Sequence, residues 1–124
     1  MKKNEVFFLE IDKISPSQLY LSEKKLKELA DFKPTAKEAL PIKQLDGKIF
    51  LTDAHHRAYL FYKTGFTKLP VYWDVDELPL EIYEICLDWC HEAELMKISD
   101  FEGRILTEAD YKKLWHDRCE KHFG

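Results

Sequence analysis

This chain of 124 residues has no long hydrophobic run, few cysteines and no excess of basic residues. A membrane-spanning helix needs about 20 consecutive apolar residues, so the sequence excludes a membrane partner. The N-terminus begins with basic residues, but the apolar segment that follows is too short for a secretory signal. We therefore expect a cytoplasmic protein.

The three cysteines are Cys86, Cys90 and Cys119. An odd number of cysteines in a chain that is not secreted favours reduced thiols over disulfides. Cys86 and Cys90 share a helix face, and a zinc site with Cys119 is geometrically conceivable, but the spacing is not that of a C-x2-C knuckle. We expect buried free thiols and no metal site.

The balance of charges bears on the choice of partner. The chain has 19 Lys and Arg against 23 Asp and Glu, which gives a net charge of -4. A dedicated nucleic-acid binder usually has a basic face, whereas the lysines here alternate with acids. DNA is therefore a disfavoured partner. The 45% hydrophobic content is enough for the core of a single domain.

Patterns of apolar and turn-forming residues predict the secondary structure. Asp46-Gly47 between two apolar runs is a strong hairpin signal, and Gly65 is a natural helix C-cap. We predict strands over 6–14, 40–45, 48–52 and 69–74 and helices over 23–31, 53–64, 80–96 and 108–121, with 98–106 irregular. Composition shifts after Asp76, so we expect a core over 1–76 and a helical C-terminal extension over 77–124 that packs on it.

The turn over residues 52–58 is the most informative stretch. A strand that leads directly into a helix presents unpaired N–H groups at the positive end of the helix dipole, which together form an anion site. Arg57 can bind a phosphate bidentately or form a salt bridge with a neighbouring acid. Asp53 can cap the helix, or it can serve as a Mg²⁺ ligand or a base.

The two histidines of this turn, His55 and His56, are consecutive. On a helix they point about 100° apart, so they are not expected to chelate one metal ion. One of them can face a phosphate while the other packs or caps. The turn as a whole favours a bound phosphate or a reacting phosphoryl group.

Segments across the first 76 residues together resemble the ParB/sulfiredoxin-like fold. They cover residues 14–19, 40–42, 46–47, 52–58 and 65–71, and they follow the order of strand, helix, hairpin, strand, helix and strand. The resemblance implies an α+β fold with a small mixed sheet and helices, here followed by the helical C-terminal extension. It is weak evidence for function, because one fold hosts several chemistries.

Four groups with this fold differ in function. ParB proteins bind a cytidine nucleotide and centromeric DNA through a following helix-turn-helix domain, which is not found here. Sulfiredoxins have a cysteine where this chain has His55, so sulfinic acid reduction is not expected. Some ParB-like domains are labelled nucleases, which this turn alone does not support. Members that phosphorylate free serine with ADP or ATP carry a D-G-H-H/T-R turn, which this chain resembles most, although Ala54 replaces the glycine.

The resemblance to the serine kinases implies a site. Its nucleotide would be ADP or ATP with Mg²⁺, bound by His55, His56 and Arg57, and its substrate a small hydroxyl compound such as serine. Asp53 and Glu23 are the candidate catalytic carboxylates. Glu23 can orient the acceptor hydroxyl, or it can simply favour the start of its helix.

Two other interpretations stay open at this point. The chain can be a non-enzymatic ParB-like module that binds DNA or a protein, or a scaffold whose site has decayed. Ala54 keeps the second alternative open, because a Cβ narrows the approach of a phosphate to the backbone. The sequence does not decide the oligomeric state.

Overall fold

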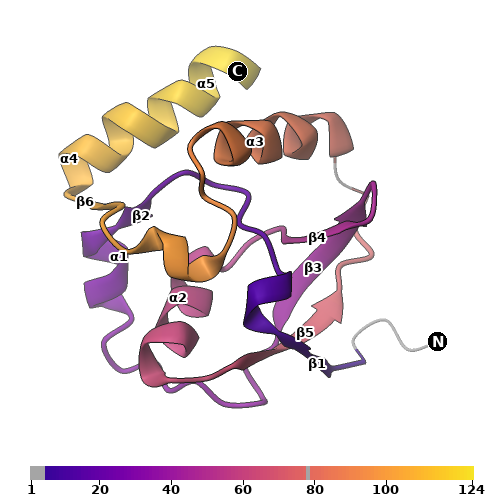
Figure 1. The fold of residues 1–124 in the computed structure, drawn as a ribbon. Coiled ribbons are helices and arrows are strands. Elements are labelled where there is room, and N and C mark those ends of the chain that lie inside the picture. Colours follow the sequence, from indigo (N-terminus) through magenta and orange to yellow (C-terminus); the bar gives the residue numbers. More distant parts are fainter. Residues whose placement is uncertain (1–4, 78) are drawn as a thin grey trace.

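A four-stranded mixed sheet and a set of helices form the fold in a computed structural model that describes residues 5–77 and 79–124 (Figure 1). The strand order is β1–β5–β3–β4, with β3 and β5 parallel and the other two pairs antiparallel. This confirms the predicted α+β class. The strands are β1 (Phe7–Glu10), β3 (Leu40–Leu45), β4 (Lys48–Leu51) and β5 (Lys68–Trp73).

The hairpin of β3 and β4 forms where the sequence predicts it. Its turn residues Asp46 and Gly47 have φ angles of 51° and 81°, the left-handed conformation that a tight hairpin turn requires. The edge strand β1 is shorter than predicted. It ends at Glu10, and the 3-10 helix η1 (Ile11–Lys13) follows, because this turn lets both Ile11 and Ile14 enter the core.

The helices α1 (Glu23–Glu28) and α2 (His55–Thr64) differ from their predicted bounds by two or three residues. The left-handed Gly65 ends α2 as predicted, with a φ of 103°. The start of α2 is different, because Ala54 and not Asp53 is its N-cap. The face that α2 turns to the core includes Ala58 and Phe61, both fully buried.

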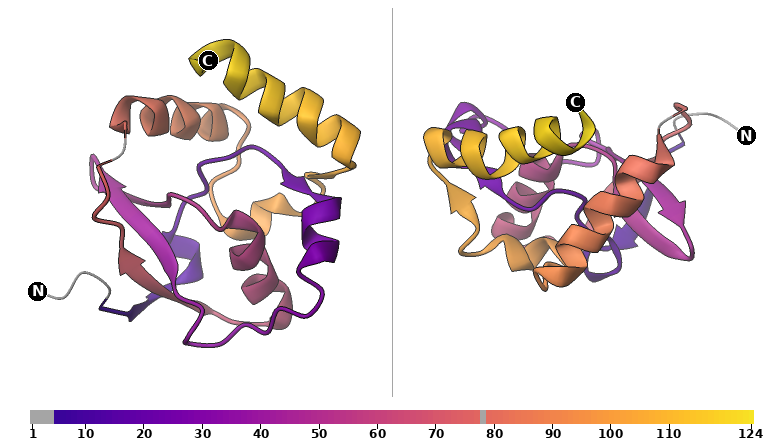
Figure 2. Two further views of the ribbon diagram at one scale, coloured as in Figure 1. Left: turned by 180° about the vertical axis from the view of Figure 1, so that it is seen from behind. Right: turned by 90° about the horizontal axis from the view of Figure 1, so that it is seen from above.

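The C-terminal part contains α3 (Leu80–Glu92), the 3-10 helix η2 (Ile98–Phe101) and a long last helix. The predicted helix over 80–96 is four residues too long, since the chain turns away at Glu94, which has a φ of 59°. The last helix consists of α4 (Glu108–Tyr111), the π-helical turn η3 (Lys112–His116) and α5 (Asp117–Phe123). Figures 1 and 2 show it as one continuous rod beside α3.

The segment after residue 76 packs closely on the first part. Its strand β6 (Ile105–Leu106), in a stretch predicted as irregular, pairs in parallel with β2 (Leu21–Ser22). Arg104 Nε donates to the carbonyl of Leu19 at 2.8 Å. Phe101 and Trp115 belong to the same hydrophobic core as Val71. The domain boundary at residue 76 stays a prediction. In the part of the chain that the structure describes, no helix has the length and apolar character to cross a membrane.

Candidate functional site

The turn between β4 and α2 is built on a backbone conformation that side chains rarely adopt. Ala54 has φ 66° and ψ 30°, in the left-handed region, and its carbonyl accepts from the Ala58 N–H at 3.0 Å. The Asp53 carboxylate accepts from the Ala54 N–H at 2.7 Å, before the helix begins. Within residues 5–77 and 79–124, no side chain caps α2. The first turn of α2 therefore keeps N–H groups available to an anion.

The two histidines hold this turn against the segment that precedes α1. His55 Nε2 accepts from the Ser17 N–H at 2.8 Å, and His56 Nε2 accepts from the Ser22 N–H at the same distance. Both rings are buried. Each imidazole thus binds a backbone N–H that lies 38 or 34 residues earlier in the chain. The histidines fix the start of α2 relative to the start of α1.

Burial keeps both histidines neutral. It lowers the pKa of His55 from 6.5 to about 3, with a smaller contribution from His56. Burial also lowers the pKa of His56 to about 4, assisted by Lys25 and opposed by Asp53. Because Nε2 accepts a hydrogen bond in each neutral ring, the proton is on Nδ1. His55 Nδ1 is buried and has no partner among the described residues.

A cavity of about 300 Å³ lies between α1 and the start of α2. Both helices contribute to its wall, which consists of Lys25, Glu28, Leu29, Asp53, Ala54, His56 and Arg57. Among the described residues, neither Lys25 nor Arg57 forms a salt bridge. Two cationic residues without an ion pair, Lys25 and Arg57, therefore border the same space as the neutral His56 and the first turn of α2.

The structure brings some of the predicted site residues together and separates others. Asp53, His56 and Arg57 line the cavity. His55 lies behind this wall, on Ser17 and against the ring of Phe101. The exposed Glu23 is not part of the wall, and its carboxylate pairs with Lys27 at 3.0 Å. The catalytic and phosphate-binding roles of these residues stay predictions.

Three wall residues were not predicted from the sequence, and all belong to the region of α1. Lys25, Glu28 and Leu29 follow the i, i+3, i+4 spacing that places side chains on one helix face. That spacing is a usable signal for a shared face, but it does not show what the face opposes. Glu28 is the carboxylate of this region that reaches the cavity.

The cysteines have the character of packed thiols. Burial raises the pKa of Cys86 and of Cys90 to about 12 in each case. Within the described ranges, no group of three or more His, Cys, Asp or Glu residues could hold a metal ion.

Comparison with known proteins gives partial likenesses only. No protein-family model matches the chain, and no curated protein matches its sequence. A solved free serine kinase in complex with AMP superposes with a TM-score of 0.47 and 23% identity, over 60% of this chain and 32% of that protein. A protein from Agrobacterium tumefaciens superposes with a TM-score of 0.46 and 19% identity, over 77% of this chain and 52% of that protein.

Proposed function

We propose that the cavity between α1 and α2 binds the phosphate groups of a nucleotide, ADP or ATP. The observation that supports this best is the convergence of Lys25, Arg57 and the uncapped start of α2 on one space of about 300 Å³. Helix N-termini and cationic side chains are the common means of binding phosphate. A volume of this size is at the lower end of the range for small-molecule sites.

Each donor has its own part in this proposal. The guanidinium of Arg57 matches two phosphate oxygens at once, whereas the ammonium of Lys25 acts as a point charge. His56 adds a neutral N–H donor that keeps its proton on Nδ1 while Ser22 occupies Nε2. A hydrogen bond to a charged group contributes about 1.5–3 kcal/mol. Arg57 alone can thus change the affinity by about one to two orders of magnitude.

Magnesium fits the carboxylates of this cavity. Mg²⁺ is commonly held by one or two carboxylates together with substrate phosphates and water. Asp53 and Glu28 both line the wall, and one Asp53 oxygen is engaged by the Ala54 N–H while the other is free of any hydrogen bond within the described residues. Asp53 would hold the ion, which leaves Glu28 available as the proton acceptor. When bound, it would neutralise phosphate charge.

The proposed reaction is phosphoryl transfer to a small hydroxyl compound such as serine. The bond between the terminal phosphorus and its bridging oxygen breaks, and a new bond forms to the acceptor oxygen. The acceptor proton passes to a carboxylate, for which Glu28 is better placed than Glu23 because it borders the cavity. The role of Lys25 and Arg57 is to hold the phosphate in line and to stabilise its charge.

We further propose that the chain belongs to the ParB/sulfiredoxin-like group, on the basis of its motif order. The match of the Asp53–Arg57 turn to the serine kinase pattern supports a kinase-type member. His55 at the sulfiredoxin cysteine position argues against sulfinic acid reduction.

A thermal-shift panel tests the proposal. The ligands are AMP, ADP, ATP, CTP and inorganic phosphate, each with and without Mg²⁺. A ligand at about 100 times its dissociation constant adds about 2.7 kcal/mol, which raises the melting temperature by several degrees. We expect such a shift with ADP or ATP, and we expect Arg57→Ala to abolish it.

Two further variants keep the panel interpretable. Arg57→Lys retains the positive charge but loses the guanidinium that binds two phosphate oxygens at once. It should therefore weaken the thermal shift without abolishing it. Lys68→Ala removes an exposed lysine of β5 that does not line the cavity and should leave the shift unchanged. Absence of a shift with every nucleotide would overturn the proposal. Salt-sensitive retention of DNA in that case would favour the binding-module alternative.

A further inference from the structure

A second cavity, of about 190 Å³, adjoins the first along α1. The long C-terminal helix forms its far wall. The residues around it are Ser22, Lys24, Lys25 and Glu28 from the region of α1, and Glu108, Tyr111, Lys112 and His116 from α4 and η3. The cavity therefore exists only where the C-terminal helix meets α1.

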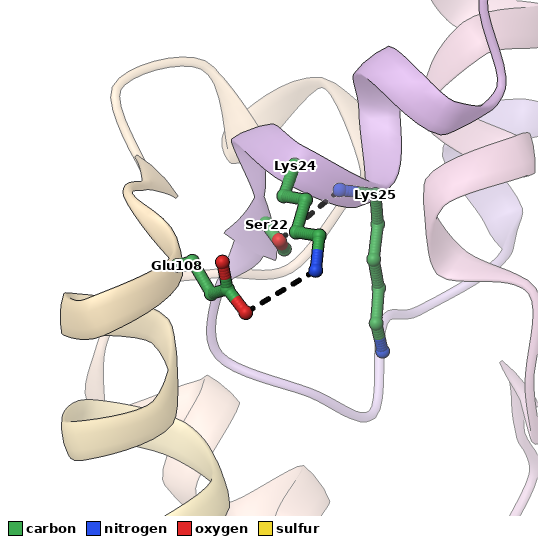
Figure 3. Close-up of polar contacts among 4 residues, drawn as sticks. All are labelled: Ser22, Lys24, Lys25 and Glu108. Atoms are coloured by element: carbon green, nitrogen blue, oxygen red, sulfur yellow. Dashed lines mark hydrogen bonds and ion pairs between the residues drawn. The ribbon is translucent and has the colours of Figure 1, made fainter.

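Lys25 and Glu28 line both cavities, so the two spaces meet at these side chains. The backbone of Lys25 is fixed by the cap of α1, since Ser22 Oγ accepts from the Lys25 N–H at 3.2 Å (Figure 3). Its ammonium lies over the ring of Tyr111, 5.2 Å from the centroid. A ligand in the second cavity would thus be adjacent to a phosphate in the first.

The charges around the second cavity favour an anion. Three lysines and two glutamates line it, so the lysines outnumber the carboxylates by one. Lys24 pairs with Glu108 at 3.3 Å (Figure 3), and Lys112 pairs with Asp117 at 3.1 Å. All four side chains are about half exposed or more, so these ion pairs are weak. An anionic ligand can replace either carboxylate.

We infer that the second cavity is the acceptor site, and that it takes a small hydroxyl compound carrying an anionic group, a carboxylate or a phosphate. This rests on the phosphate-binding function proposed for the first cavity. Lys24 and Lys112 bind the anionic group, and Glu28 accepts the hydroxyl proton as the hydroxyl oxygen bonds to the terminal phosphorus of ATP. The bond to the bridging oxygen breaks and ADP leaves. The C-terminal helix is thereby part of the site.

Calorimetric titration of the full chain tests the assignment, with DL-glycerate, glycerol 3-phosphate and glycerol as probes. Each probe is titrated without nucleotide and with ADP and Mg²⁺ present, so that the first cavity is blocked in one arm. We expect glycerate or glycerol 3-phosphate to bind in the blocked arm and glycerol to bind much more weakly. Comparison of the two anions identifies which group the site prefers.

Variants separate this site from the first cavity. Lys24→Ala combined with Lys112→Ala should weaken the anionic probe about tenfold and leave ADP binding unchanged. Glu108→Gln frees Lys24 and should strengthen the probe about threefold. The control is Glu102→Gln, which removes the Lys63–Glu102 pair, of similar exposure and outside both cavities, and should change nothing.

The outcomes are distinguishable. If ADP binds but the anionic probes bind no better than glycerol, the acceptor assignment is wrong and the proposed function stands. If the double lysine variant leaves the anionic probe unaffected, the assignment is also wrong. If ADP fails to bind in any arm, the proposed function fails, and with it the acceptor role.

Discussion

The helices α1 and α2 both border the first cavity, but they begin in different ways. Ser22 caps α1 through its side chain, and Glu23 adds a negative charge to the first turn. The cap residue of α2 is Ala54, which has no side-chain donor or acceptor, and its first turn contains Arg57 and no acid. An acid is favoured at a helix start and a cation is not.

The start of α1 therefore stabilises its helix, whereas the start of α2 is open to a ligand. In the first turn of α1, the Ser22 side chain accepts from the Lys25 N–H. The first turn of α2 lacks such a cap and has a cation where a stabilising anion is expected, so a bound phosphate would complete it. The two histidines connect the two starts, because both accept N–H groups from the segment that leads into α1.

Acid should disrupt the histidine hydrogen bonds that join the two helix starts, and it should have the largest effect on stability. The pKa of His55 is about 3 and that of His56 about 4 in the folded chain, against 6.5 when unfolded, so the unfolded chain binds more protons between these values. Their contribution to stability is therefore complete well above pH 6.5, and it is lost as the pH falls toward 4 for His56 and toward 3 for His55. At pH 5, which is above both folded pKa values, we expect a loss of about 2 kcal/mol from each histidine, measured by urea unfolding.

A matched pair of variants isolates the histidine contribution. His56→Gln retains an acceptor for the Ser22 N–H but does not titrate, so it should reduce the loss between pH 7 and pH 5. His91→Gln replaces an exposed histidine of α3 and should leave the loss unchanged. Equal pH dependence in all three proteins would show that the buried histidines are not its source.

Removal of the cap of α1 should have an intermediate effect. Ser22→Ala deletes the oxygen that accepts from the Lys25 N–H, and loss of such a cap costs about 1 kcal/mol of stability. Thr107→Ala removes the corresponding cap of α4, which accepts from the Asp110 N–H at 3.3 Å, and serves as the reference for a cap loss. Urea unfolding that shows no loss for Ser22→Ala would contradict the stabilising role of this helix start.

The smallest effect is expected at the cap of α2. The left-handed backbone of Ala54 costs about 1–2 kcal/mol, and Ala54→Gly removes this cost. The glycine also raises the conformational entropy of the unfolded chain, which offsets most of the gain. We expect a net stabilisation of about 0.5 kcal/mol. Asp46→Gly, in the hairpin turn at φ 51°, is the matched change remote from α2 and should act in the same direction. A clear destabilisation by Ala54→Gly in urea unfolding would be inconsistent with this account.

Local signals were enough to predict much of the fold. Asp46-Gly47 predicted the hairpin and Gly65 predicted the end of α2. Each of these features depends on a left-handed backbone conformation at one or two neighbouring residues. The pairing of Leu21–Ser22 with Ile105–Leu106 was not predictable, since two residues provide no periodic pattern. The cap of α2 was also misplaced, because Asp53 has the chemistry of a cap while Ala54 has the conformation.

Only the α2 side of the candidate site could be predicted from the sequence. Asp53, His56 and Arg57 lie in one short motif, so their proximity follows from the chain itself. Lys25 and Glu28 line the cavity because α1 lies across it from the start of α2, and the histidine hydrogen bonds that join the two segments span 34 and 38 residues. Such long-range contacts leave no local signal.

The most direct test of the central claim is a titration of the ¹⁵N-labelled chain with ADP and Mg²⁺, followed through its backbone amide signals. The account predicts that the largest shifts occur at His55, His56 and Arg57, with much smaller shifts at Glu23 and Lys24. Shifts of equal size at both helix starts, or none at the start of α2, would contradict it.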